Sequence, residues 1–194
     1  IPAPGDGLTI APVDDGATIV CTYTNSRLPN VVKSAGGVSG PDAQGQYVAT
    51  YSLAVDNPGA ATTYGALTDT PAFAPNLEVL GATWTAASTS GPAPAGGTAA
   101  GAGPFTLAPA ATPIAAAASH TYSLAVTFRF LTYTAAAACG GPGTGVFNSA
   151  GTATSETTMA DNTACVPPPA PPAPSIDVQK SASPASVSTA GATV

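Results

Sequence analysis

The residues of this chain that could do chemistry are few, and three of them are cysteines. Cys139 and Cys165 flank a Gly/Pro-rich loop and a predicted strand, which favours a disulfide. Such a bond would close a loop of roughly 26 residues and contribute about 3 kcal/mol of stability. Cys21 is then left over, either unpaired or paired upstream. No Cys-x-x-Cys spacing indicates zinc or redox chemistry, so a disulfide in an oxidising, extracellular compartment is the simpler interpretation.

The remaining reactive side chains form no recognisable catalytic set. His120 is the only histidine, and no Gly-x-Ser-x-Gly motif surrounds a nucleophile, so a triad is not indicated. We expect His120 near the surface, where a strand begins. Asp161-Asn162 lacks the alternating acidic loop of calcium sites. The sequence therefore predicts no enzyme, no metal site and no cofactor.

Charge and hydropathy exclude two classes of partner. Only 7% of the residues are charged, and the net charge is -6 with four cationic side chains in all: Arg27, Lys33, Arg129 and Lys180. So few cations form no basic patch for phosphates, and we expect no nucleic-acid partner. No apolar run approaches the roughly 20 residues needed to span a bilayer, so we expect no membrane insertion in this segment.

Hydrophobic alternation predicts strands throughout. The hexapeptide Thr-Tyr-Ser-Leu-Ala-Val occurs at residues 50–55 and again at 121–126, each time with Tyr, Leu and Val on one face. These two segments are predicted to be central strands that contribute matching layers to a core. Further strands are predicted at Leu77–Trp84, Val146-Phe147 and Ala150–Thr154. The tract Ser88–Gly103 has little to bury and is predicted to be a mobile loop or extended coil.

A near-repeat relates two parts of the chain about 147 residues apart. Asn30-Val31-Val32-Lys33-Ser34-Ala35 returns as Ile176-Asp177-Val178-Gln179-Lys180-Ser181-Ala182. We therefore expect one complete module between partial modules. The predicted divisions are the closing strand or strands of a preceding β-domain, or an N-terminal arm, at 1–28; a β-sandwich repeat at 29–166; a polyproline linker at 167–174; and the opening strand of a following repeat, or a C-terminal arm, at 175–194. The linker would hold its neighbours about 25 Å apart.

Five short motifs resemble a known family in their order and spacing. They are Lys33-Ser34, Tyr51–Asn57, Leu67–Pro71, Phe147–Ala150 and Asp161–Cys165. Over residues 30–170 they resemble the bacterial surface repeat known as domain of unknown function eleven. Residues 16–28 are similar to the closing strand of a prealbumin-like adhesin domain of the pilin type. The resemblance implies an immunoglobulin-like antiparallel β-sandwich in a secreted bacterial protein.

The related adhesin folds imply one chemical possibility, a spontaneous isopeptide bond between a lysine and an asparagine assisted by a buried carboxylate. By motif position the candidates are Lys33, Asn148 and Asp69, and Asn25 is the analogous residue of the preceding domain. The reaction needs an amine made neutral by desolvation and an acid that shuttles protons. The alternative is that Lys33 is a solvated edge-strand lysine, Asp69 caps a turn and Asn148 bonds to backbone.

Two functions follow as expectations. In the first, the chain is a structural, non-catalytic stalk or spacer of a secreted bacterial cell-surface adhesin. In the second, it is the subunit of an extracellular filament assembled by exchange of terminal strands, which would expose unpaired backbone to a neighbour. The expected partners are neighbouring repeats or copies of the chain itself, and the sequence names no other ligand.

Overall fold

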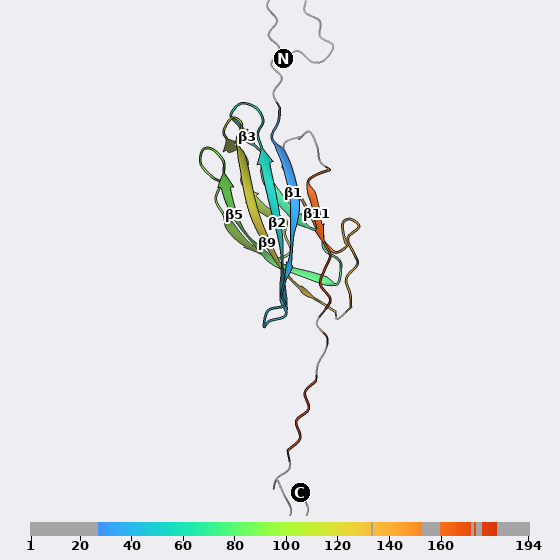
Figure 1. Ribbon diagram of the computed structural model, residues 1–194. Helices are drawn as coiled ribbons and strands as arrows, with labels where there is room; N and C mark the ends of the chain where they lie inside the picture. The colour runs from blue at the N-terminus through green and yellow to red at the C-terminus, as the bar shows by residue number, and fades with distance from the viewer. Residues whose placement is uncertain (1–26, 133, 153–159, 172, 174–175, 182–194) are drawn as a thin grey trace, which may run out of the picture.

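The computed structural model describes residues 27–132, 134–152, 160–171, 173 and 176–181, which form an antiparallel β-sandwich (Figure 1). These residues contain no helix. The all-β sandwich predicted from the sequence is therefore confirmed. The strands are β1 (Asn30–Ser39), β2 (Gln46–Asp56), β3 (Thr62–Tyr64), β4 (Leu67–Pro71), β5 (Leu77–Ser88), β6 (Gly97–Ala100), β7 (Phe105–Ala108), β8 (Thr112–Ile114), β9 (Ser119–Phe130), β10 (Val146–Thr152) and β11 (Thr163–Val166).

Two sheets make the layers of the sandwich. One has the strand order β1-β2-β9-β5-β6, and the other has the order β11-β10-β4-β7. Strands β3 and β8 form a separate two-stranded pair. Figure 1 shows β11 beside β1, so this edge of the sandwich brings the first and last strands of the module together.

The core is built mainly from the two strands that carry the repeated hexapeptide. Strands β2 and β9 pair antiparallel, with Tyr51 opposite Leu124 and Leu53 opposite Tyr122. Both strands alternate buried and exposed residues over most of their length, as period-two patterning predicts. Each large apolar side chain buried here contributes about 1.5–3 kcal/mol. The predicted matching layers are therefore confirmed.

The structure corrects two details of the predicted elements. The tract Ser88–Gly103 contains a short edge strand, β6, which pairs with residues 81–84 of β5. Its alanines and threonine bury little, so the sequence shows no apolar pattern there, and the strand follows from backbone pairing. Strand β11 was not predicted either, because its four residues are only partly buried.

Some predictions fall on parts of the chain that the structure leaves undescribed. The closing strand at 16–28 lies almost wholly outside the described residues, and so do Cys21, Asn25 and most of the segment 175–194. Within the described residues, no helix is long and apolar enough to cross a membrane.

Candidate functional site

Three polar residues occupy inward-facing positions where the alternation of their strands calls for apolar side chains. Lys33 lies two residues after Val31 in β1, Asp69 lies two after Leu67 in β4, and Asn148 lies two after Val146 in β10. The three apolar residues are fully buried, and the polar residues are buried with them, at 5%, 0% and 0% exposure for Lys33, Asp69 and Asn148. Buried charged residues are rare unless paired.

The fold brings the three side chains to one place from two sheets. Lys33 comes from the five-stranded sheet, whereas Asp69 and Asn148 come from neighbouring strands of the four-stranded sheet. Ala150 pairs with Asp69 and Asn148 with Pro71, so Asn148 and Asp69 are diagonal neighbours on one face. Lys33 Nζ contacts Asp69 Oδ2 directly. The strands therefore place the amine, the carboxyl and the carboxamide in a single buried cluster.

Hydrogen bonding within this cluster is incomplete. Asp69 Oδ1 and both side-chain polar atoms of Asn148 are buried without a hydrogen-bond partner. Asn148 still lies near enough to Asp69 to lower the pKa of the Asp69 carboxyl. A buried polar atom left unpaired costs about 1–3 kcal/mol, so three of them together call for an explanation beyond stability.

Burial shifts both ionisable groups toward their neutral forms. Desolvation lowers the pKa of Lys33, and the charge and hydrogen bond of Asp69 oppose that shift only in part. Desolvation likewise raises the pKa of Asp69, against the opposing effects of Lys33 and Asn148. Both shifts favour the neutral amine, which is the form of lysine that can act as a nucleophile.

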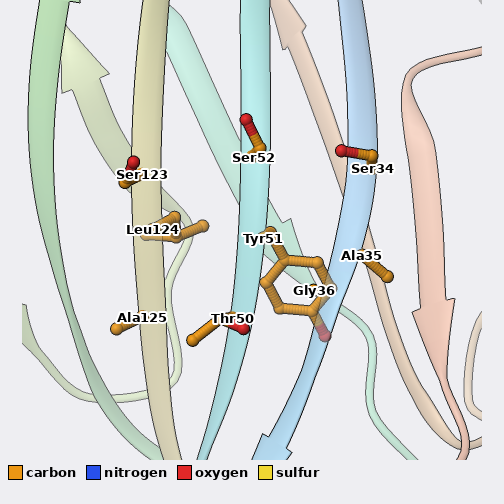
Figure 2. Close-up of a pocket in the computed structure, with 9 residues that line it drawn as sticks. All are labelled: Ser34, Ala35, Gly36, Thr50, Tyr51, Ser52, Ser123, Leu124 and Ala125. Atoms are coloured by element: carbon orange, nitrogen blue, oxygen red, sulfur yellow. The ribbon is translucent and has the colours of Figure 1, made fainter.

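Tyr51 links the cluster to the surrounding strands. The centroid of its ring lies 4.8 Å from Lys33 Nζ, and Figure 2 shows the ring reaching from β2 toward β1. Its hydroxyl donates a 2.6 Å hydrogen bond to the carbonyl of Val146, two residues before Asn148. Desolvation by burial raises the pKa of Tyr51, so the hydroxyl stays protonated as a donor. Tyr51 therefore covers the amine and ties β10 to β2.

The alternative interpretation, in which Lys33 is solvated, Asp69 caps a turn and Asn148 bonds to backbone, is wrong. Lys33 is buried, Asp69 lies within strand β4 and caps no turn, and the Asn148 side chain bonds to no backbone group. What remains is a nucleophile, an acid and an amide held together in a buried cluster, which is the set that amide transfer needs.

The predicted disulfide is present. Cys139 and Cys165 are joined, with their Cα atoms 5.9 Å apart. Cys165 is the register partner of Phe147, the residue before Asn148. The disulfide therefore lies close to the buried cluster along β10.

A second buried polar cluster was missed by the sequence analysis. His120 was expected near the surface but is 1% exposed, because it occupies an inward position of β9 two residues before Tyr122. The Tyr64 hydroxyl is 2.9 Å from His120 Nδ1 and 2.6 Å from the Tyr122 hydroxyl. Burial lowers the pKa of His120. The period-two alternation with Tyr122 and Leu124 was the signal that could have revealed its burial.

Other parts of the described surface offer less chemistry. A shallow hollow of about 290 Å³ lies over β1, β2 and β9 and is lined largely by small side chains such as Ser34, Ser52 and Ser123 (Figure 2). No histidine or carboxylate lines it, so its hydroxyls have no base to activate them. In the described residues, no group of three or more His, Cys, Asp or Glu side chains is placed to hold a metal ion.

Comparison of this chain with protein-family models, with curated proteins and with solved structures finds no match.

Proposed function

We propose that this chain is a structural, non-catalytic module of a secreted bacterial cell-surface protein, a stalk or spacer whose sandwich is locked by an isopeptide bond between Lys33 and Asn148. The observation that carries the proposal is the buried cluster of Lys33, Asp69 and Asn148 with its unpaired polar atoms. The disulfide supports an extracellular location, because such bonds persist in oxidising compartments.

The reaction balances within the cluster. The neutral Lys33 amine attacks Cγ of Asn148, the Nζ–Cγ bond forms, and the Cγ–Nδ2 bond breaks. Asp69 takes one proton from the attacking amine and gives one to the departing nitrogen, which leaves as ammonia. The carboxyl ends in its starting state, and the Asn148 nitrogen that had no partner is removed. No cofactor or oxidant is required.

The position of the bond suits a module that carries load. Figure 1 shows the chain reaching β1 at one end of the sandwich and leaving β11 at the opposite end. A bond from Lys33 to Asn148 would carry force between the sheets and bypass about 115 residues of folded chain. Asn148 also lies inside the loop closed by Cys139 and Cys165, so the two crosslinks interlock. The proline-rich segment after β11 then serves as a stiff spacer to the next module.

Single-molecule force spectroscopy tests this function. The module is fused in tandem to a marker domain of known extension and pulled from both ends. The wild-type chain should release no length from residues 33–139. Lys33→Met should release about 350 Å, because the disulfide keeps residues 139–165 closed and the roughly 106 freed residues before it extend by about 3.3 Å each. A wild-type module that unfolds with the length released by Lys33→Met would refute the load-bearing role.

A filament subunit is the second candidate, favoured by the segment 176–181. Ile176 and Val178 are exposed at 89% and 81%, and Lys180 repeats the position of Lys33 in the opening motif. If this segment replaced β1 in a second copy, Lys180 would meet Asp69 of that copy. Electron microscopy at increasing protein concentration should then show fibres that Lys180→Met abolishes. Dispersed particles at every concentration would exclude the filament.

A further inference from the structure

The segment that leads into β11 bridges the two strands that hold the reacting side chains. The backbone N–H of Lys33 donates a 2.8 Å hydrogen bond to the carbonyl of Asp161. The N–H of Ala150 donates a 2.8 Å bond to the carbonyl of the next residue, Asn162. One dipeptide thus holds both β1 and β10, and its position sets the position of Lys33 relative to Asn148.

Few backbone hydrogen bonds hold the Asp161–Asn162 bridge in place. Strand β11 is an edge strand of four residues that pairs with β10 on one side only. On its other side β10 pairs with β4, where Asn148 lies opposite Pro71. Proline has no N–H to donate, so the ladder is weaker at the residue that must react.

The disulfide supplies the missing restraint. It joins Cys165 of β11 to Cys139, and both sulfurs lie against Gly145, the residue before β10 begins. A Cβ at Gly145 would lie 2.8 and 2.9 Å from the two sulfur atoms, so the contact leaves no room for a side chain. The φ angle of Gly145 is +50°, which also favours glycine. The bond therefore fixes β11 and the start of β10 against each other.

We propose that the Cys139–Cys165 disulfide is the positioning element for the isopeptide reaction, so that the crosslink forms quickly only in chains whose disulfide is already closed. The inference rests on the proposed function. Near-attack geometry explains the dependence, since a displacement of about 1 Å can slow such a reaction about 100-fold. The order of events would also delay crosslinking until the chain reaches an oxidising compartment.

Folding kinetics of the double variant Cys139→Ser/Cys165→Ser, compared with wild type when both are recovered unfolded from inclusion bodies before any crosslink has formed, test the proposal. Denaturing mass spectrometry monitors crosslinking as the loss of one ammonia. The folding conditions are ones in which circular dichroism shows that the variant is folded. The crosslinking rate of the variant should fall at least tenfold, whereas the pH at half-maximal rate should not move, because the lysine and the acid are untouched. Ile114→Ala is the matched control, since it lowers stability by a comparable amount while leaving the disulfide in place. It should crosslink at the wild-type rate.

A measurement on the wild-type chain decides the question even if the double variant does not fold. Wild-type chain that has not yet crosslinked, recovered unfolded and reduced from inclusion bodies, is folded in glutathione buffers of graded composition, and free thiols are alkylated at intervals. Trypsin cuts after Arg129 and Lys180, so Cys139, Asn148 and Cys165 stay on one peptide, which carries two labels where the disulfide is open and none where it is closed. Early crosslinks should occur in the unlabelled peptide. Equal crosslinking in both populations would overturn the positioning role, whereas no crosslink in fully oxidised protein would overturn the proposed function itself.

Discussion

Lys33→Met should remove the isopeptide bond and lower the stability of the module by an amount that follows from the loop the bond closes. The loop spans about 115 residues, and its closure entropy in the unfolded chain corresponds to about 5 kcal/mol. For a module of this size we expect a fall in Tm of about 10–20 °C. Methionine resembles lysine in length and leaves no unpaired amine in the core, but it removes the partner of the Asp69 carboxyl. The free energy lost is therefore that of the crosslink plus the cost of this unpaired carboxyl, about 1–3 kcal/mol.

Denaturant unfolding without reductant separates loss of the crosslink from ordinary packing loss. A chain closed into a loop exposes less surface when it unfolds, so the uncrosslinked variant should show a larger m-value than the wild type. Asp69→Asn keeps both reacting groups but lacks the proton shuttle, and it should show the same larger m-value. Val126→Ala truncates the core and should lower stability at the wild-type m-value. If Lys33→Met unfolded with the Tm and m-value of the wild type, the reasoning would be refuted.

Three further predictions concern titration and packing. The crosslinking rate should show a bell-shaped dependence on pH, because the reactive form of the Lys33–Asp69 pair is a neutral amine beside a protonated carboxyl. Acid converts the amine to an unreactive ammonium, and base removes the proton from the carboxyl. A rate independent of pH would contradict this. Because the folded-state pKa of His120 lies below its unfolded value of about 6.5, the unfolding free energy should fall as pH drops below that value, and His120→Gln should remove this slope in urea titrations. Tyr51→Phe leaves the Val146 carbonyl without its donor and should cost about 1–2 kcal/mol in chemical unfolding, while Thr50→Ala, exposed on the neighbouring position, should cost almost nothing.

Part of the fold could be read from the sequence because some strands bury a regular face. The two hexapeptide copies alternate large apolar and small polar residues, so their pairing as β2 and β9 follows from simple patterning. Strand β6 carries glycine, threonine and alanine, and it is held by backbone pairing that no side-chain pattern records. The burial of His120 follows from the alternation of β9, but its hydrogen-bond partner Tyr64 comes from a distant two-stranded pair that no local pattern indicates.

The sequence predicted which residues form the candidate site but not how they are arranged in space. Lys33, Asp69 and Asn148 were selected through a family resemblance, and the long intervals between them in the sequence show no periodicity that would join them. Their contact follows from the pairing of β10 with β4 and from the packing of the two sheets. The bridge through Asp161 and Asn162 could not be predicted, because it consists of backbone hydrogen bonds between distant segments.

The most direct test of the central claim is the intact mass of the folded, oxidised wild-type chain, measured after denaturation and followed by peptide mapping. The account predicts a mass lower than that of the disulfide-bonded sequence by one ammonia, and a branched peptide joining Lys33 to Asn148. The masses of Lys33→Met and Asp69→Asn should show no such loss. A wild-type chain that keeps its full mass after prolonged incubation at neutral pH would contradict the account.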